Sequence, residues 1–215
     1  MNILFNGSTL LGVAWVLFFS DVSAAVDKNT TDASGEYYDA SYCETCHGVG
    51  AKGNEGIQAP RIAGFDAWYL QRQLQAFRAD HRGAHPSEID ALGMRAIAAK
   101  MTDKNIAEVI NKISQWQADK AAPTLTGDVV AGKSLYRQCG SCHGPRGEGN
   151  EALGAPELAG QNDWYLVNQL RKFKHHLRGR HPEDRYGMQM SAIIDTLPDE
   201  EAMINVVSYI NTFLQ

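Results

Sequence analysis

The sequence predicts an all-α protein built from two tandem, related domains. Two observations carry this prediction. A five-residue motif of the form C-x-x-C-H occurs twice, at residues 43–47 and 139–143, and the residues that follow the two copies are alike. In both halves of the chain, apolar residues recur at intervals of three and four, which is the period of an amphipathic α-helix, and no convincing strand-like alternation appears.

The two halves are related by a duplication. The first cysteine of one motif and the first cysteine of the other are 139 − 43 = 96 residues apart. This offset holds without a gap for 61 aligned pairs of residues, of which 25 are identical. Such identity at a constant offset indicates a repeated domain. We therefore expect a first domain at residues 35–117, a linker at 118–126 and a second domain at 127–215.

The expected helices follow the same order in both domains. In the first domain, one apolar stripe runs over residues 68–78 and another over residues 103–116. In the second domain, the corresponding stripes end at Phe173 and run over residues 199–213. Each domain is thus expected to hold a few short helices.

The N-terminal segment, residues 1–25, resembles a secretory signal peptide. Residues 3–19 are mostly apolar, and the small residues that follow offer cleavage after Ala24 or Ala25. No Lys or Arg precedes the apolar run, so an uncleaved membrane anchor is the alternative, although the run is short and interrupted by polar residues. Either interpretation predicts export of the remaining chain. Residues 26–34 are polar and aperiodic, and we expect a flexible lead-in there.

The C-x-x-C-H motif is typical of covalent haem attachment. The chain has four cysteines, all of them in the two motifs: Cys43, Cys46, Cys139 and Cys142. On a helical turn, residues three apart face the same way, so both sulfurs of one motif can form thioethers with one porphyrin edge. The adjacent histidine, His47 or His143, can then bind the iron from one side. We therefore predict two covalently bound haem c groups.

Three other uses of these cysteines are alternatives. A structural zinc site also uses C-x-x-C pairs, but zinc-binding pairs usually lie closer in sequence and do not each carry an adjacent histidine. A thioredoxin-like redox motif would follow a strand, and no β-rich run precedes either copy. Paired disulfides would suit an exported protein but would leave both histidines unexplained.

Two pairs of residues at matched positions could bind the iron from the opposite side. Met94 and Met190 form one pair, and His85 and His181 form the other. A thioether ligand stabilises ferrous iron and gives a relatively high potential, whereas a second imidazole lowers the potential. We predict that the methionines are the ligands and that they lie in loops just ahead of the last helix. The two histidines are then loop residues, bonded to backbone or to a propionate.

Other repeated residues have expected supporting roles. Pro60 and Pro156 follow the motif at equal distance, where a rigid Ala-Pro carbonyl could accept the ring N–H of the proximal histidine; an ordinary turn proline is the alternative. Arg82 and Arg178 could pair with haem propionates or be surface cations. His81 has no matching histidine, and we expect it to be solvated.

Charge and hydropathy limit the class of partner. The formal net charge is −5 at pH 7, so no global basic field suggests a nucleic-acid partner. The one local basic run, residues 171–180, is expected to be a solvated helix face, with steering of an acidic partner as the alternative. Beyond the N-terminal segment, no stretch is long and apolar enough to span a membrane.

Together these motifs resemble those of di-haem class I cytochromes c of the cytochrome c4 family, over essentially everything after about residue 35. In the second domain the resemblance rests on Gly132, Tyr136, Cys139, Cys142, His143, Gly144, Ala155, Pro156, Leu158, Ala159, Gly160, Gln161, Tyr165, Gln169, Leu170, Met190, Leu197 and Asp199. The first domain repeats many of these features through Cys43, Cys46, His47, Pro60, Gly64, Tyr69, Gln73, Leu74 and Met94. Two features depart from the pattern: residues 35–38 fit it less well, and the Arg-Gly-x-His-Pro loops are longer and more basic.

The resemblance implies two cytochrome-c-like domains, each wrapped around one haem. It implies that His47 with Met94, and His143 with Met190, bind the two irons, and that the prolines accept from the proximal histidines. It also implies a periplasmic electron carrier and not an enzyme. The expected partners are redox proteins, namely a quinol-oxidising complex or dehydrogenase upstream and a terminal oxidase or reductase downstream.

Two alternatives to a soluble carrier stay open. One is a cytochrome subunit of a membrane redox complex, held there by its partner or by an uncleaved N-terminus. The other is a di-haem oxidoreductase, of a thiosulfate-oxidising or peroxidase type, with one open haem site. The presence of Met94 and Met190 at equal positions argues against an open site, because each iron then has a candidate sixth ligand.

Overall fold

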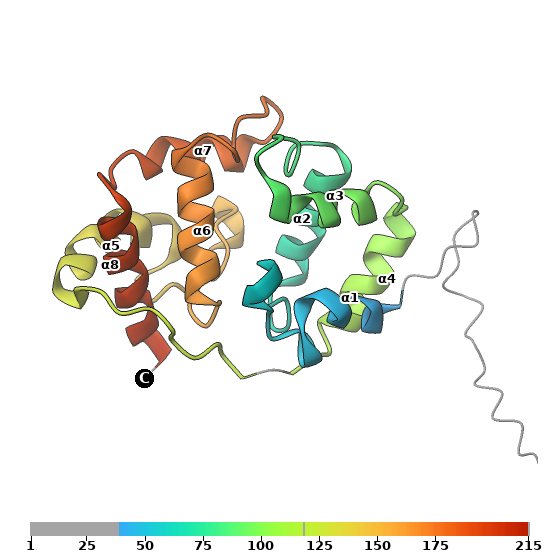
Figure 1. The fold of residues 1–215 in the computed structure, drawn as a ribbon, viewed down its shortest axis with the longest axis horizontal. Helices are drawn as coiled ribbons and strands as arrows, with labels where there is room; N and C mark the ends of the chain where they lie inside the picture. The colour runs from blue at the N-terminus through green and yellow to red at the C-terminus, as the bar shows by residue number, and fades with distance from the viewer. Residues whose placement is uncertain (1–38, 118, 215) are drawn as a thin grey trace, which may run out of the picture.

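The two halves of the chain fold into two sets of helices that lie side by side (Figure 1). The computed structural model describes residues 39–117 and 119–214. The helices of the first set are α1 (Ala40–His47), α2 (Ala67–Arg78), α3 (Leu92–Ala98) and α4 (Asp103–Ile113). Those of the second set are α5 (Val129–His143), α6 (Asp163–Lys174), α7 (Arg185–Ile194) and α8 (Glu200–Asn211).

Short 3₁₀ turns and loops join these helices: Val49–Ala51, Glu55–Ile57, Ile89–Ala91, Glu151–Leu153 and Thr212–Leu214. No β-strand occurs among the described residues, which form only isolated bridges between Asn54 and Ala59 and between Asn150 and Ala155. The prediction of an all-α fold is therefore confirmed. The predicted signal peptide at residues 1–25 and lead-in at 26–34 lie outside the described residues. Within the described part, every helix is too short or too polar to cross a membrane.

Side-chain caps determine where several helices begin. The Thr102 hydroxyl oxygen accepts a hydrogen bond from the backbone N–H of Asn105, and the Asn105 side-chain oxygen accepts one from the Thr102 backbone N–H. Asp39, Asp128 and Asp199 cap α1, α5 and α8 in the same way, through side-chain oxygens that accept from backbone N–H groups. Of these helices, α1 and α5 each end with the histidine of a C-x-x-C-H motif.

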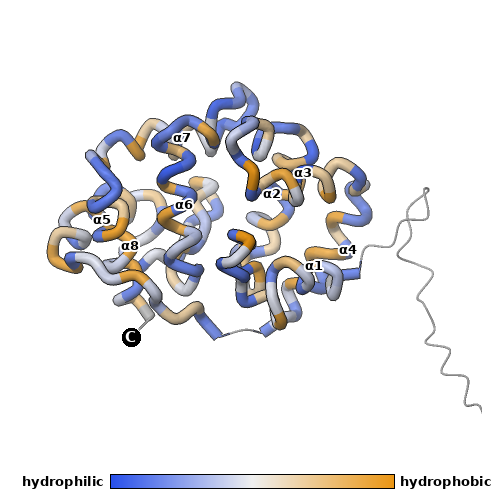
Figure 2. Tube along the Cα trace, viewed as in Figure 1, coloured by the Kyte–Doolittle hydropathy of each residue, from blue (hydrophilic) through white to orange (hydrophobic). Residues whose placement is uncertain are grey.

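Each domain has its own apolar core. In the second domain, α5, α6 and α8 share one core, made of Tyr136, Leu166, Val167, Phe173, Ile194, Leu197, Ala202, Met203, Val206, Val207 and Ile210. The first domain has a core around α4, made of Leu70, Met101, Ile106, Val109, Ile110 and Ile113, and a smaller cluster of Phe77, Ala91 and Ala98. Apolar and polar residues alternate along the helices in Figure 2, as expected for amphipathic helices around separate cores.

The connection between the domains is bound to the second domain. The Asp163 carboxylate, at the start of α6, accepts hydrogen bonds from the backbone N–H groups of Thr124 and Leu125 and from the Thr124 hydroxyl. The side chain of Asn211, at the end of α8, donates to the same carboxylate. Burial alone would raise the pKa of Asp163, but these hydrogen bonds outweigh it and the pKa is lowered. Thr124 and Leu125, at the end of the connection, are therefore held against α6 and α8.

Candidate functional site

Each motif presents two sulfurs near the surface and one buried imidazole. Cys46 and Cys142 are exposed, whereas Cys43 and Cys139 are half-buried against the cores of their own domains. The histidine that ends each helix is buried, with His47 only 5% exposed. All four cysteines are free of disulfide bonds. A group attached to either motif would therefore have one edge at the surface and its body inside the domain.

Both motif histidines are oriented by a proline carbonyl thirteen residues further on. The His47 Nδ1 atom lies 2.7 Å from the Pro60 carbonyl oxygen, and His143 Nδ1 lies 2.8 Å from that of Pro156. Because a carbonyl oxygen can only accept, Nδ1 carries the proton and Nε2 keeps its lone pair for a metal. Burial lowers the pKa of both imidazoles, although the proline hydrogen bonds oppose this, which favours the neutral form that binds iron.

The second domain contains a cavity of about 520 Å³ that brings the motif and a methionine together. Cys139, Cys142 and His143 line it from α5, and Met190 lines it from α7. Its other lining residues are largely apolar, among them Leu158, Leu166, Leu170, Phe173, Val206, Val207 and Ile210. A cavity of this kind fits a flat, mostly apolar porphyrin, with an imidazole and a thioether available as axial ligands.

In the first domain, Met94 lies in the position that corresponds to Met190. It is half-buried on α3 and packs against the cluster that contains Phe77. Phe77 corresponds to Phe173, which lines the cavity of the second domain. The prediction that both methionines lie in loops was wrong, because α3 and α7 are helices that include them. The Asp184 side chain caps α7 at the Gly187 N–H, and this helix start is what the sequence analysis missed.

The histidines in the two His-Pro loops make other bonds. His85 is exposed, and its Nδ1 accepts from the Ser87 N–H at 3.1 Å. His181 Nδ1 accepts from the Glu183 N–H at 3.2 Å, and His181 is not among the residues that line the cavity. His81 is not solvated as predicted. Its ring stacks on that of His181 from the other domain, with 4.1 Å between the ring centroids.

The domains meet through α2 and α6, which face each other at the centre of Figure 1. Arg82 Nη1 donates to Gln73 of its own domain at 2.8 Å, and its Nη2 donates to the Tyr165 hydroxyl at 2.8 Å. Arg178 makes the corresponding bonds from the other domain, to Gln169 at 2.8 Å and, more weakly, to the Tyr69 hydroxyl at 3.5 Å. Both arginines are 8% exposed, so the interpretation as surface cations was wrong.

These buried guanidiniums favour an anion at the interface. The hydrogen bonds described above go only to neutral groups, and Arg82 Nε is buried without a hydrogen-bond partner. Burial alone would raise the pKa of Tyr69, but Arg178 and Arg82 outweigh it and the pKa is lowered. Since Arg178 also lines the cavity of the second domain, its position fits a haem propionate.

The interface is not fully symmetric, because Arg72 of α2 has Asn168 as its counterpart. The Arg72 guanidinium lies over the ring of Tyr186, 4.5 Å from its centroid, and donates to the Gly154 carbonyl at 2.5 Å. Arg72 thus lines the second domain's cavity from the first domain. The side-chain amide of Asn168 instead donates hydrogen bonds to Gln58 and to Asp90 of the first domain, both at 3.0 Å. The second haem site therefore receives a cation that the first does not receive at the equivalent position.

The basic run on and after α6 is paired or buried over most of its length. Lys172 is buried and lies 3.3 Å from Glu88 and 2.7 Å from Asp90, both in the other domain. Arg171 and Lys174 form ion pairs with acidic residues of the second domain. The prediction of a solvated helix face was therefore wrong, because these cations hold the two domains and the ends of helices together.

Sequence reasoning pointed to the attachment cysteines and to candidate axial residues, but it missed most of the interface. Tyr69, Gln73 and their counterparts were recognised only as repeated positions. A signal was present, since a tyrosine and a glutamine on a helix are identical in both repeats beside an apolar stripe. Arg72 and Lys172 gave no such signal, because neither is repeated in the other domain.

Comparison with known proteins agrees with this geometry. A cytochrome c family model matches residues 34–116 and 129–213. The chain is 32% identical to the thiosulfate dehydrogenase electron acceptor of Stutzerimonas stutzeri (strain A1501), over 86% of this chain and 88% of that protein. It matches the solved structure of reduced recombinant cytochrome c4 from Pseudomonas stutzeri with a TM-score of 0.62 and 26% identity, over 80% of this chain and 93% of that one.

A second solved structure is similar over a smaller share of its length. The as-isolated form of thiosulfate dehydrogenase (TsdBA) from Marichromatium purpuratum matches with a TM-score of 0.62 and 30% identity, over 79% of this chain. This chain covers only 36% of the length of that protein.

The fold, the two motifs and these matches define a c-type cytochrome with two covalently bound haem c groups. The chain belongs to the cytochrome c family and is a di-haem, cytochrome c4-like protein. The family resemblance predicted from the sequence is thus confirmed. Proteins of this kind carry electrons, and redox proteins are the corresponding class of partner.

Proposed function

We propose that the protein is an exported electron carrier that transfers electrons from a periplasmic dehydrogenase to a terminal oxidase or reductase. The observation that supports this most directly is the paired arrangement of the sites. Cys46 and Cys142 place an edge of each haem site at the surface, and a polar interface joins the two sites inside. Electrons can then enter at one exposed edge and leave at the other.

Closed coordination is the second part of this proposal. His47 and Met94 would bind the iron in the first domain, and His143 and Met190 the iron in the second. When bound, haem c supplies one-electron chemistry between ferric and ferrous iron. Supporting this assignment, His143 and Met190 line one cavity, and both histidines present Nε2 for a metal. With both axial positions filled, substrate has no open iron to bind.

Thiosulfate dehydrogenase is the proposed donor. The similar protein from Stutzerimonas stutzeri is named as an electron acceptor of that enzyme, and the match covers most of both chains. The predicted signal peptide at residues 1–25 supports a periplasmic location. A cytochrome subunit of a membrane redox complex is the alternative arrangement, and it would use the same two haem sites.

Stopped-flow reduction tests the proposal. The oxidised holoprotein is mixed anaerobically with thiosulfate, with and without a purified thiosulfate dehydrogenase, and haem absorbance is followed. We expect both haems to become reduced only when the enzyme is present. Reduction by thiosulfate alone would show that this chain itself oxidises thiosulfate. If the haems stay oxidised in the presence of thiosulfate dehydrogenase, that enzyme is excluded as the donor.

Carbon monoxide binding tests closed coordination separately. Carbon monoxide binds ferrous haem readily where the sixth position is open, so the reduced wild-type protein should show little spectral change. Rapid binding at one haem would contradict the closed site and favour a di-haem oxidoreductase. This result does not depend on which donor is used.

A further inference from the structure

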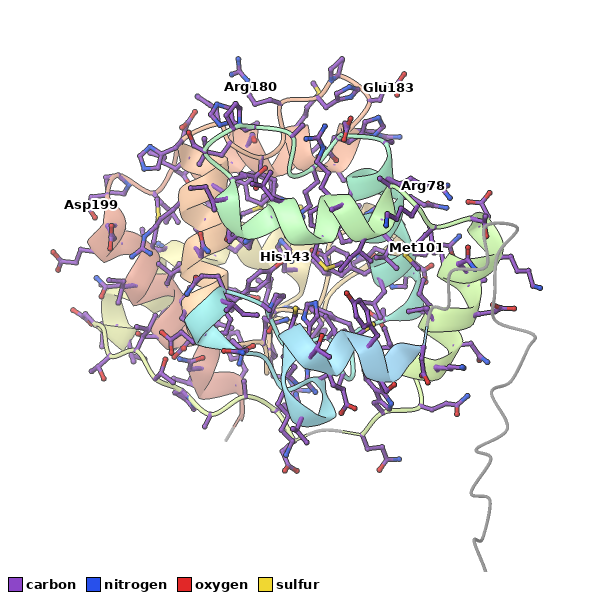
Figure 3. The ribbon with its side chains drawn as sticks, turned by 45° about the vertical axis from the view of Figure 1, so that its right-hand side comes forward. Arg78, Met101, His143, Arg180, Glu183 and Asp199 are labelled. Atoms are coloured by element: carbon purple, nitrogen blue, oxygen red, sulfur yellow. The ribbon has the colours of Figure 1, made fainter. Side chains whose placement is uncertain are left out.

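We propose that His81, His181 and Glu183 form a binding site for a divalent transition-metal ion where the two domains meet. His81 follows α2 in the first domain, and the other two residues lie in the loop between α6 and α7 of the second. One donor atom from each of the three lies within 4.8 Å of the others. In Figure 3, Glu183 lies with Arg180 at the outer edge of the molecule, and His143 lies in its interior. The site is thus separate from the haem cavity.

The spacing of the donor atoms is close to that of a metal site. His81 Nε2 lies 3.1 Å from Glu183 Oε2. A tetrahedral ion with bonds of about 2.0–2.1 Å requires donors about 3.3 Å apart, so this pair already has the right separation. The His181 donor lies within 4.8 Å of the other two and has to move closer to them to share one ion; its ring stacks on that of His81, and its Nδ1 accepts from the Glu183 N–H at 3.2 Å. All three side chains are partly or fully accessible, which permits this adjustment.

The chemistry of the donors selects the class of ion. Two imidazoles and one carboxylate suit zinc, copper or nickel, whereas magnesium and calcium prefer all-oxygen sites. Three protein ligands leave a fourth position for water. The contact between His81 and Glu183 is an ion pair only when the histidine is protonated. A divalent ion would replace it with bonds to all three residues.

The buried interface holds the two loops in place. Arg82 and Arg178 make hydrogen bonds across the interface. Arg82 directly follows His81 in sequence, and Arg178 lies three residues before His181. The backbone N–H of His81 also donates to the Ala76 carbonyl at 2.9 Å, which fixes the end of α2. On the other side, Asp80 is paired with Arg95. The positions of both histidines are therefore set by anchored backbone.

Such an ion would bind only when the domains are docked, because its ligands come from both of them. Binding would therefore stabilise the docked arrangement. The duplication does not create a second copy of this site. His85 is the counterpart of His181, but it is exposed and is absent from the cluster. His85 is thus a matched control within the same chain.

Calorimetric titration of the holoprotein with zinc chloride tests the proposal. We expect one equivalent to bind the wild type. The variants His81→Asn and His181→Asn should each weaken binding by at least about tenfold, and Glu183→Gln should weaken it as well. His85→Asn should bind like the wild type. The haem absorbance spectrum of each variant verifies that it is folded.

Thermal unfolding gives a second measurement. Zinc should raise the unfolding temperature of the wild type and of His85→Asn, but not that of His181→Asn. The proposal would be overturned if the wild type binds no zinc. It would also be overturned if binding is unchanged in His81→Asn and His181→Asn, since the zinc would then be held elsewhere, for example by propionates.

Discussion

Arg82 and Arg178 share both of their glutamine acceptors across the domain interface. Arg82 donates to Gln73 at 2.8 Å and to Gln169 at 3.1 Å, and Arg178 donates to Gln169 at 2.8 Å and to Gln73 at 2.9 Å. Since the two arginines are 96 residues apart, as are the two glutamines, the repeat has produced a nearly two-fold interface. The two buried guanidinium groups are thereby held close together, and their like charges favour the binding of anionic propionates nearby.

Replacing Arg178 with Gln should lower the midpoint potential of the second haem. Oxidised haem carries one more positive charge than reduced haem, so a neighbouring cation favours reduction, and its loss favours oxidation. We expect a decrease of several tens of millivolts, where about 59 mV corresponds to a tenfold change in the equilibrium constant. Potentiometric titration followed by haem absorbance measures it. Arg180→Gln, which removes an exposed cation from the same loop, should leave both potentials close to those of the wild type.

Arg72, which has no arginine at the equivalent position of the second domain, predicts a difference between the potentials of the two haems. Arg72→Asn gives the first domain the residue that the second has at the same position, Asn168. Because Arg72 lines the cavity described in the second domain, its loss should lower that haem's potential more than the other's. The same titration resolves the two waves. A decrease of equal size at both haems would contradict this local effect.

The sequence predicted the parts of the site that are repeated and local. C-x-x-C-H gives two haem-attachment cysteines and one candidate iron ligand within five positions, and the equal spacing of Pro60 and Pro156 predicted a carbonyl acceptor. The helical position of Met94 and Met190 was missed, because α3 and α7 are short and α7 depends on a cap by Asp184. Helices this short depend on tertiary packing, which local sequence patterns do not show.

The domain interface could not be predicted from periodicity. His81 stacks on His181, and Lys172 pairs with Glu88, only because the second domain docks on the first. Neither pair is close in sequence, and the ion pair of Lys172 with Glu88 has no equivalent in the other repeat. A buried ion pair also resembles two surface charges when only the sequence is available.

Two glycine substitutions should have opposite effects on stability. A Cβ at Gly132 on α5 would lie 2.0 Å from the Asn205 carbonyl oxygen of α8, so Gly132→Ala should destabilise the protein by about 1–3 kcal/mol. A Cβ at Gly93 on α3 meets nothing within 4 Å, so Gly93→Ala should stabilise it by up to about 1 kcal/mol. Urea unfolding followed by circular dichroism compares them. Equal effects of the two would show that α5 and α8 do not pack this closely.

Asp163 should contribute to stability in a pH-dependent way. Its pKa is lowered in the folded protein, so its contribution is fully present above the unfolded carboxyl pKa of about 3.9. The contribution is lost as pH falls from there through the lower folded pKa. Asp163→Asn should cost about 3 kcal/mol near neutral pH, because the carboxylate accepts bonds from Thr124, Leu125 and Asn211.

The free energies of unfolding of wild type and Asp163→Asn, measured in urea from about pH 7 to about pH 3, check this prediction. The difference between them should shrink below about pH 4. Glu151→Gln, which alters an exposed carboxylate at the surface of the same domain, should show no comparable loss. A difference that stays constant over the whole range would contradict the role given to the Asp163 charge.

The axial methionines provide the most direct test of the proposed carrier. Magnetic circular dichroism of the oxidised holoprotein should show low-spin iron at both haems, with a methionine-to-iron charge-transfer band. Met94→Ala and Met190→Ala should each remove about half of that band. Met188→Ala, an exposed methionine on the same helix as Met190, should leave it unchanged. High-spin iron in the wild type, or an unchanged band in either ligand variant, would contradict closed His/Met coordination.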